Sequence, residues 1–347
     1  MYITGNVVIG SSFSLIMIKG TVKWGIIGCG DVTEIKSGPA FQKVDNSGLS
    51  AVMRRNGEKA ADYAKRHHVQ QWYDDADKLI NDPEINAVYV ATPPSSHAKY
   101  AIQSMKAGKP VYVEKPMALS TDECQEMIDV SKKTGVPLYV AYYRRALPYF
   151  VRLKELLDKN TIGDVKTVNV ILHWPPYPEE LEGNPGWRVN PSISGGGHFH
   201  DLASHQFDFL EFAFGPIKEV SGIKANQAGL YTAEDAVSAV FLFESGITGT
   251  GSWCFTVPEQ QAKEVTEIVG SKGRISFSFF SSTVLHIETE TKTENFDIPH
   301  PEHVHQPLVD LVVKDMRGEG SCPSTGETGI RATLIMDKIV GKNEAIW

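Results

Sequence analysis

The chain has 347 residues, a length that predicts about two domains, each large enough to bury a core of its own. Hydrophobic residues make up 41% and charged residues 22%, which excludes a disordered, collagen-like or small disulfide-stapled protein. The net charge of −8 and the shortness of every Lys/Arg run argue against nucleic acid and acidic membrane surfaces as partners.

The four cysteines are far apart and form no C-x-x-C pair. We therefore predict reduced thiols in a cytoplasmic protein, and no zinc site. The first 18 residues are uncharged, but glycines and polar residues interrupt them and no basic segment precedes them, so a secretory signal or membrane span is not expected. We interpret residues 1–19 as an N-terminal extension, with Met17 as a natural start and residues 1–16 as upstream sequence.

From Val22 the chain reads as a strand, a glycine turn and a helix-like segment that continues to Val44. Gly28 permits a tight turn, and Gly30 lets a pyrophosphate approach the backbone in front of the helix amides. Thr33 stands where the full fingerprint has a third Gly or Ala. Ordinary strand-to-helix turns share this pattern, so the elements that follow must distinguish such a turn from a dinucleotide-binding loop. The residues predicted to bind a dinucleotide here are Gly28, Cys29, Gly30, Asp31 and Val32.

Short apolar runs then alternate with helical periodicity. Strands are expected at 49–53, 87–91, 111–113 and 138–141, and helices at 58–68, 98–107 and 121–134. Ser120 and Glu123 predict a capping box for the last helix. This alternation predicts a doubly wound parallel sheet, whose ligand site lies at the carboxyl ends of the strands. The segments 92–94 and 114–116 each follow a strand end, so we expect both to face the cofactor.

The end of the second strand indicates the cofactor. An enzyme that uses NAD places an acidic residue there for the ribose 2′-hydroxyl, but this chain has Arg54 and Arg55. Two guanidinium groups would bind a 2′-phosphate through charge-assisted hydrogen bonds, although solvated surface arginines are the alternative. We predict NADP in preference to NAD.

Three further segments carry a specific pattern. Residues 91–97 read ATPPSSH, residues 107–116 read AGKPVYVEKP, and Trp187-Arg188 is followed at 195–205 by GGGHFHDLASH. With these residues the chain resembles the glucose-fructose oxidoreductase, inositol dehydrogenase and rhizopine catabolism protein (Gfo/Idh/MocA) family, from about residue 21 to the C-terminus. The resemblance implies a Rossmann domain, here residues 20–141, and an α+β domain with a large open antiparallel sheet, here residues 142–347. It also implies reversible hydride transfer between nicotinamide and a secondary alcohol carbon, usually of a sugar or polyol.

The second half of the sequence agrees with such a sheet. Runs rich in β-forming residues lie at 165–172, 220–225, 236–243, 248–255, 264–269, 274–280 and 284–290. A broad sheet needs cover on its second face, and the resemblance implies that another subunit often supplies it. We expect a homodimer or homotetramer.

Alcohol oxidation needs a base that reaches the hydroxyl proton, and histidine suits this task. Asp201 and His205 are four residues apart in an expected helix at 201–212, so they project from one face. Lys115 follows a strand end, where an ammonium group would stabilise developing alkoxide charge. By resemblance these three residues are the catalytic set. We assign His205 as general acid/base, Asp201 as its orienting or substrate-binding partner, and Lys115 as the electrostatic and proton-relay residue.

The resemblance also implies further contacts. Residues expected to bind the cofactor are Arg54, Arg55, Thr92, Pro93, Pro94, His97, Glu114, Lys115, Trp187 and Arg188, and residues expected to bind the substrate are Tyr143, Arg144 and His198. A metal bound by His198, His200, Asp201 and His205 is the alternative. The resembling family works without a metal, so we expect none.

The leading hypothesis is an NADP(H)-dependent oxidoreductase acting on a small sugar or polyol. One alternative is a glycoside hydrolase that keeps its nicotinamide and uses transient oxidation to drive elimination. Another is a regulatory protein that senses a dinucleotide without chemistry.

Overall fold

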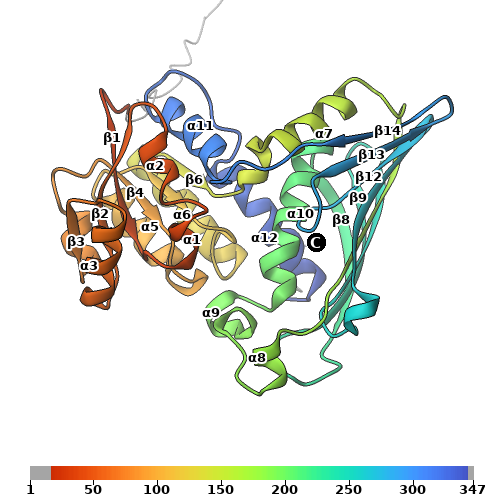
Figure 1. Ribbon diagram of the computed structural model, residues 1–347, viewed down its shortest axis with the longest axis horizontal. Helices are drawn as coiled ribbons and strands as arrows, with labels where there is room; N and C mark the ends of the chain where they lie inside the picture. Colours follow the sequence, from red (N-terminus) through yellow and green to blue (C-terminus); the bar gives the residue numbers. More distant parts are fainter. Residues whose placement is uncertain (1–16, 343–347) are drawn as a thin grey trace, which may run out of the picture.

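The computed structural model describes residues 17–342, and Figure 1 shows two sheets joined by helices. The expectations for residues 1–16 lie outside the described residues. The first sheet has six strands in the order β3-β2-β1-β4-β5-β6, with every neighbouring pair parallel. Its strands are β1 (Val22–Ile27), β2 (Ser47–Met53), β3 (Gln71–Tyr73), β4 (Ala87–Val90), β5 (Val111–Val113) and β6 (Leu138–Val140). This order confirms the predicted doubly wound sheet.

Helices cover both faces of this sheet, as the alternating sequence pattern predicted. One face packs against α2 (Ala40–Lys43), α3 (Gly57–Arg66) and α11 (Gln306–Met316). The other face packs against α4 (Ala76–Ile80), α5 (His97–Lys106) and α6 (Thr121–Thr134). α11 comes from the far end of the chain, so C-terminal residues complete the core of the first sheet. The predicted domain boundary between residues 141 and 142 stays a prediction.

The helix expected from the glycine turn to Val44 is wrong. The structure has two short helices there, α1 (Asp31–Glu34) and α2, with a turn between them. The turn contains Gly38 and Pro39, and a Cβ atom at Gly38 would overlap Thr33 O and the Tyr63 hydroxyl. Pro39 cannot continue the helix, because it lacks an N–H and its ring clashes with the preceding turn, and Tyr63 Oη donates to Thr33 O at 2.7 Å beside the break.

The capping box at α6 forms only in part. Ser120 Oγ accepts from the backbone N–H of Glu123 at 3.3 Å, as predicted. The Glu123 carboxylate, however, accepts from Leu119 N at 3.0 Å rather than from Ser120. The helix start is therefore satisfied by one capping bond and by a second bond one residue earlier.

The second sheet has eight strands in the order β14-β13-β12-β11-β7-β10-β9-β8. Neighbouring pairs are antiparallel except β7 and β10, which are parallel. The strands are β7 (Val165–His173), β8 (Ile217–Ala225), β9 (Ala236–Phe243), β10 (Thr248–Cys254), β11 (Lys263–Gly270), β12 (Gly273–Phe277), β13 (Val284–Thr289) and β14 (Thr293–Asp297). The predicted fold class is confirmed. β3 and β14 were not expected, because each is short and mostly polar or exposed.

One face of the second sheet packs against α10 (His198–Phe214), where Trp253 of β10 meets Phe199 edge-on and Phe207 at a tilt. Trp253 Nε1 donates to Gln206 Oε1 at 2.7 Å, and this bond satisfies the buried indole N–H and the buried amide oxygen. In Figure 1 no α-helix of the described chain lies on the opposite face. The remaining helical elements are η1 (Pro94–Ser96), η2 (Tyr143–Ala146), α7 (Pro148–Asp158), α8 (Pro178–Leu181), η3 (Trp187–Val189), α9 (Pro191–Ser194), η4 (Glu259–Gln261) and α12 (Gly326–Ile339).

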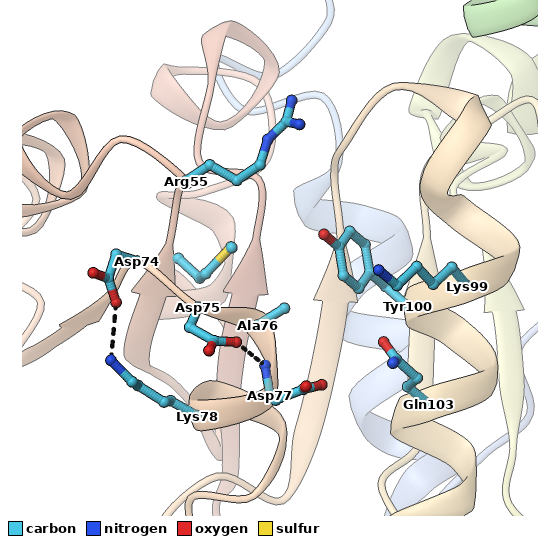
Figure 2. A pocket seen from close by; sticks show the side chains of 10 residues that line it. Arg55, Asp74, Asp75, Ala76, Asp77, Lys78, Lys99, Tyr100 and Gln103 are labelled. Atoms are coloured by element: carbon cyan, nitrogen blue, oxygen red, sulfur yellow. Dashed lines mark hydrogen bonds and ion pairs between the residues drawn. The ribbon is translucent and has the colours of Figure 1, made fainter.

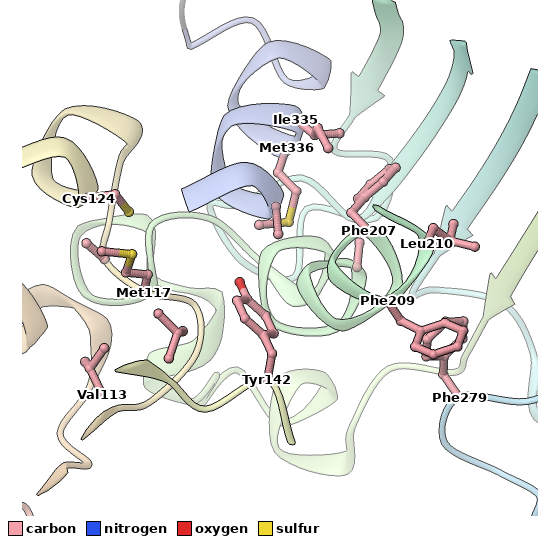
Figure 3. Packing of buried hydrophobic residues seen from close by; sticks show 14 of the residues in the cluster. Val113, Met117, Cys124, Tyr142, Phe207, Phe209, Leu210, Phe279, Ile335 and Met336 are labelled. Carbon is pink, nitrogen blue, oxygen red and sulfur yellow. The ribbon is translucent and has the colours of Figure 1, made fainter. Parts of the chain in front are cut away.

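A continuous hydrophobic core joins the two sheets. Figure 3 shows Val113 and Met117 of the first half, Tyr142 between the halves, and Phe207 and Met336 beyond it. All of these side chains are buried in one cluster. Residues that follow the strands of the first sheet are therefore held at a fixed distance from α10.

Across residues 17–342, none of the helices combines the length and the apolar composition that a membrane crossing requires.

Candidate active site

The loops after β1 and β4 touch each other where the strand order reverses. Gly28 has a φ of +96°, and a Cβ atom there would lie 2.7 Å from Thr92 Cγ2 and 2.9 Å from Thr92 N. At Gly30 the nearest atom to such a Cβ is 3.9 Å away, so the loop surface is open. The amides of Asp31 and Val32 open α1 and have no acceptor within the helix. Bare backbone donors beside an open glycine fit a pyrophosphate.

Cys29 contributes only its backbone to this loop. Its side chain is buried in the core cluster, and burial raises the pKa of its thiol to about 11. Its N–H donates to Met53 O at 3.2 Å, which ties the glycine turn to the end of β2.

His97 holds two of the loops together. It is fully buried, with Nε2 at 2.6 Å from Thr92 O and Nδ1 at 3.0 Å from Pro116 O. Burial lowers the pKa of His97 to about 4, so the ring is neutral and its single N–H serves one carbonyl at a time. Its contribution to cofactor binding would be to position the loops after β4 and β5.

Glu114 also points into the protein. Its carboxylate accepts a hydrogen bond from the Tyr89 hydroxyl and one from Lys115 N at 3.2 Å. His305 Nε2 lies 3.6 Å from the same carboxylate. Burial raises the pKa of Glu114. The Glu114 side chain thus fixes the backbone of Lys115 through this hydrogen bond.

The arginines after β2 have no carboxylate partner among residues 17–342. Arg54 Nη1 donates to Cys29 O at 3.3 Å, and Arg55 is exposed beside a cavity of about 400 Å³. Figure 2 shows that Asp74 pairs with Lys78 at 3.1 Å and that Asp75 caps α4. The third carboxylate of this cavity, that of Asp77, forms no ion pair with either arginine in the described structure. Both guanidinium groups are therefore available to an anion.

Lys115 and Asp201 meet across the two halves of the chain. Lys115 Nζ lies 2.5 Å from Asp201 Oδ1 and 2.9 Å from Asp201 O, and Arg188 Nε lies 3.5 Å from Asp201 Oδ2. Burial alone would raise the pKa of Asp201, but the charges of Lys115 and Arg188 outweigh it and hold the pKa below its usual range. The carboxylate is ionised and shared by two cations.

His205 lies one turn further along α10 and is buried. Its Nδ1 has no hydrogen-bond partner in the described structure, and its ring lies 5.2 Å from that of Tyr143 and 6.1 Å from that of Phe280. Burial, and then the charges of Arg144 and Lys115, lower its pKa well below the usual value. The imidazole is neutral, in the form that accepts a proton. No hydrogen bond links it to Asp201 within residues 17–342, so of the two predicted roles for Asp201 the geometry favours substrate binding.

The remaining histidines of the glycine-rich motif are held by carboxylates. His198 Nε2 lies 2.6 Å from Glu180 Oε1, and both side chains are buried. His200 Nδ1 lies 3.0 Å from Glu234 Oε1. Within residues 17–342, no three or more His, Cys, Asp or Glu side chains are placed together so as to hold a metal ion.

His305, which lies beside Tyr143 and Glu114, was not predicted from the sequence. It precedes α11, its ring lies 4.5 Å from that of Tyr143, and its Nδ1 lies 3.2 Å from the Tyr112 hydroxyl. Three histidines within residues 300–305 were the available signal. Nothing in the sequence indicated that α11 docks on the first sheet and brings this segment to Tyr143.

Comparison with known proteins identifies the family. Residues 22–142 match the family model described as "Oxidoreductase family, NAD-binding Rossmann fold", and residues 150–276 match "GFO/IDH/MocA C-terminal domain". The chain is 41% identical to Oxidoreductase P35 of Formosa agariphila over 93% of its own length and 100% of that protein. This chain belongs to the Gfo/Idh/MocA oxidoreductase family.

Other members are more distant. 1,5-anhydro-D-fructose reductase of Ensifer adhaerens is 25% identical over 89% of this chain and 92% of that protein. A structure of levoglucosan dehydrogenase with NADH and levoglucosan superimposes with a TM-score of 0.81 at 22% identity, over 92% of this chain and 96% of that chain. At this identity the likeness shows the fold alone. The family match makes this protein an NAD(P)-dependent oxidoreductase.

We expect Gly28→Ala to weaken binding of the nicotinamide cofactor at least about tenfold and to destabilise the fold, because its Cβ would collide with Thr92. Gly229→Ala is the matched control, since Gly229 also has a positive φ, of +66°, but no atom lies within 4 Å of a Cβ there. Both variants carry the backbone cost of about 1–2 kcal/mol, and only Gly28→Ala adds the collision. Fluorescence titration with NADH and with NADPH measures the first effect, and urea unfolding measures the second. Equal losses in both variants would contradict the role assigned to the Gly28–Thr92 contact.

Proposed function

We propose that this family member is an NADP(H)-dependent oxidoreductase that transfers a hydride between nicotinamide and a secondary alcohol or ketone carbon of a sugar or polyol. The observation that carries the proposal is the Lys115–Asp201 ion pair beside a neutral, buried His205 at the carboxyl ends of the parallel strands. The activities named for 1,5-anhydro-D-fructose reductase and levoglucosan dehydrogenase support the substrate class.

The chain's own residues divide the proton chemistry. When bound, nicotinamide supplies the two-electron acceptor or donor of the reaction. In alcohol oxidation the carbinol C–H bond breaks with loss of a hydride, the O–H bond breaks with loss of a proton, and a C=O bond forms. Neutral His205 receives the proton. The Lys115 ammonium donates to the reacting oxygen and stabilises its developing negative charge, while Asp201 holds that ammonium and binds substrate.

For the cofactor we propose residues around the glycine loop. The amides of Asp31 and Val32 beside Gly30 would hold the pyrophosphate, and Arg54 with Arg55 would hold the 2′-phosphate of NADP. The support is that both guanidinium groups lack a carboxylate partner among residues 17–342, since the nearby Asp74 is paired with Lys78. Arg188 lies 3.5 Å from Asp201, and its guanidinium carbon lies 4.5 Å from the centre of the Trp187 ring, so we propose that this pair meets both ligands.

We also propose a cytoplasmic location. All four cysteines are free, and burial raises the pKa of Cys29 to about 11 and of Cys124 and Cys322 to about 12. Such thiols are protonated and inert, which suits a reducing compartment.

A second copy of this chain is the proposed partner. The face of the second sheet without helices exposes Ile223 of β8 and Val240 of β9, which are 75% and 57% accessible. The strand register makes these two side chains diagonal neighbours on one face, and an apolar pair of this kind is what packing of one sheet on another buries. The proposed assembly is a homodimer or homotetramer.

We expect His205→Asn and Lys115→Met each to lower kcat on the order of 10²-fold or more, because each removes a group that handles the proton or the charge of the reacting oxygen. NADPH affinity should stay within about threefold, since most of the proposed cofactor contacts come from the glycine loop and from Arg54 and Arg55 rather than from these two side chains. Absorbance of reduced nicotinamide across aldoses, ketoses, inositols and sugar acids measures turnover. Exposed His286→Asn and Lys132→Met serve as controls. Full turnover in either active-site variant would overturn the assignment, and wild-type protein that binds NADPH but gives no single turnover would favour a sensor.

We expect Arg54→Asp to weaken NADP binding by about 1.5–3 kcal/mol, roughly 10- to 150-fold in Kd, because a charge-assisted contact is replaced by repulsion. The preference should shift toward NAD, which has no 2′-phosphate. Calorimetric titration with NADP and NAD measures the two affinities, and Lys132→Asp controls for the change in net charge. An unchanged ratio would show that the phosphate is bound elsewhere.

We expect the wild-type protein to show two or four times the chain mass of 38.2 kDa by light scattering, and Val240→Glu to reduce the assembly. A carboxylate on each facing sheet would be desolvated and repelled by its copy. Val151→Glu, at another exposed valine on α7, should leave the mass unchanged. A monomeric wild-type protein would refute the proposed assembly.

A further inference from the structure

Two adjacent arginines after β6 are equally buried but differently compensated. Arg144 and Arg145 are each only 6% exposed. Arg145 forms two hydrogen bonds with Asp208, from Nε at 2.9 Å and from Nη2 at 2.7 Å. Arg144 has no carboxylate within ion-pair distance anywhere in residues 17–342. A buried charge normally has a partner, so Arg144 is the exception to be explained.

Arg144 is held by neutral groups. Its Nε and Nη2 donate to Phe279 O at 3.3 and 3.0 Å, and its Nη1 donates to the Tyr143 hydroxyl at 3.1 Å. The guanidinium stacks over Phe280 at 4.6 Å. The Phe279 turn is itself fixed, because the Glu264 carboxylate accepts from the amides of Phe279, Phe280 and Ser281. Three of five N–H groups are used, which leaves two donors and the full charge.

The groups around Arg144 are neutral and incompletely hydrogen-bonded. His205 Nδ1 and His300 Nδ1 are buried without a partner in the described structure. Burial, and then the charge of Arg144, lower the pKa of both histidines. Buried polar atoms in proteins are nearly always satisfied, so two open ring nitrogens beside an uncompensated cation indicate a missing polar ligand.

The other charges near His205 do not compensate Arg144. The Asp201 carboxylate is already shared by Lys115 and Arg188. Glu114, the other carboxyl group near Lys115, is bonded to Tyr89 and Lys115 N. Lys115 is balanced by Asp201, Arg188 is half-exposed, and the Glu264 carboxylate is bonded to the amides of the Phe279 turn. The buried guanidinium of Arg144 therefore has no ion-pair partner of its own among the described residues, and an anionic ligand would supply one.

We infer that the substrate carries a carboxylate, as uronic and aldonic acids do, and that Arg144 binds it. This inference rests on the proposed function, because it places the carboxylate in the site where Lys115 and His205 meet the carbinol. A monoanion matches the single excess charge, whereas a phosphate dianion would exceed it. A charge-assisted hydrogen bond to Arg144 would supply much of the discrimination against neutral sugars.

A carboxylate bound to Arg144 would also change the basicity of His205. The positive charge of Arg144 is one cause of the lowered pKa of His205. A carboxylate beside Arg144 offsets that charge, so His205 becomes a stronger proton acceptor only when an acidic substrate is bound. The carboxylate would thus contribute to turnover as well as to binding.

The test compares acid and neutral sugars that differ at one carbon. Nicotinamide reduction is measured with NADP for D-glucuronate against D-glucose, D-galacturonate against D-galactose, and D-gluconate against sorbitol. We expect kcat/KM for the best acid to exceed that of its neutral counterpart at least about tenfold. Glucose 6-phosphate is included as a phosphate-bearing competitor.

Variants connect the preference to one side chain. Arg144→Met should bring the ratio of acid to neutral kcat/KM close to one, mainly through a higher KM for the acid, and Arg144→Lys should restore part of it. Arg152→Met, on α7 with its side chain paired to Glu155, is the control and should keep the wild-type ratio. If Arg144→Met does not fold, calorimetric binding of glucuronate and glucose to the wild-type NADP complex decides the question.

The outcomes distinguish a failure of the carboxylate inference from a failure of the proposed function. Equal kcat/KM for acid and neutral sugars, or a preference for glucose 6-phosphate over glucuronate, overturns the inference and leaves the proposed oxidoreductase intact. No turnover of any sugar overturns the proposed function, and glucuronate binding by calorimetry then still decides whether Arg144 recognises a carboxylate.

Discussion

The buried ion pair between Arg145 and Asp208 is the contact on which the geometry of the site depends. It joins the segment after β6 to α10 by two hydrogen bonds, and Arg145 Nη1 adds a third to Pro323 O at 2.6 Å. Asp208 lies on the same helix as His205 and Asp201, one and two turns away. Removing one member of such a pair costs about 3–5 kcal/mol, because it leaves a charge buried without compensation. The pair therefore sets where α10 lies relative to Lys115.

With α10 in place, the charges around the reacting group are arranged unequally. Asp201 is shared between Lys115 and Arg188, His205 is neutral, and Arg144 has no anion. Arg144 and Arg145 are neighbours of the same residue type with different surroundings. The charge of Arg145 is paired with Asp208 and holds α10, whereas we propose that the charge of Arg144 binds a ligand. A site with a neutral base and an excess cation is suited to a substrate that brings its own negative charge.

Much of the architecture was predictable because it follows from local patterns of apolar and polar residues in the sequence. Alternating apolar runs and helical periodicity predicted the parallel sheet, and β-rich runs predicted seven strands of the second sheet. The motif residues Lys115 and Asp201 were also predicted, and the structure brings them together. The break between α1 and α2 was missed although Gly38-Pro39 marks it locally, since a proline ring cannot continue the preceding helix. His305 was missed for a different reason, since its position depends on how α11 docks.

The sequence by itself determined the fold class, the glycine turn, the arginines after β2 and, among the residues near the site, Lys115, Asp201 and His205. Those properties follow from periodicity and from motif spacing within short stretches of chain. Only the tertiary structure decided which charges are paired: Asp201 with Lys115, Asp208 with Arg145, and Arg144 with none among the described residues. Pairing depends on distances between segments far apart in the chain, and on burial, which sets the energetic cost of leaving a charge alone.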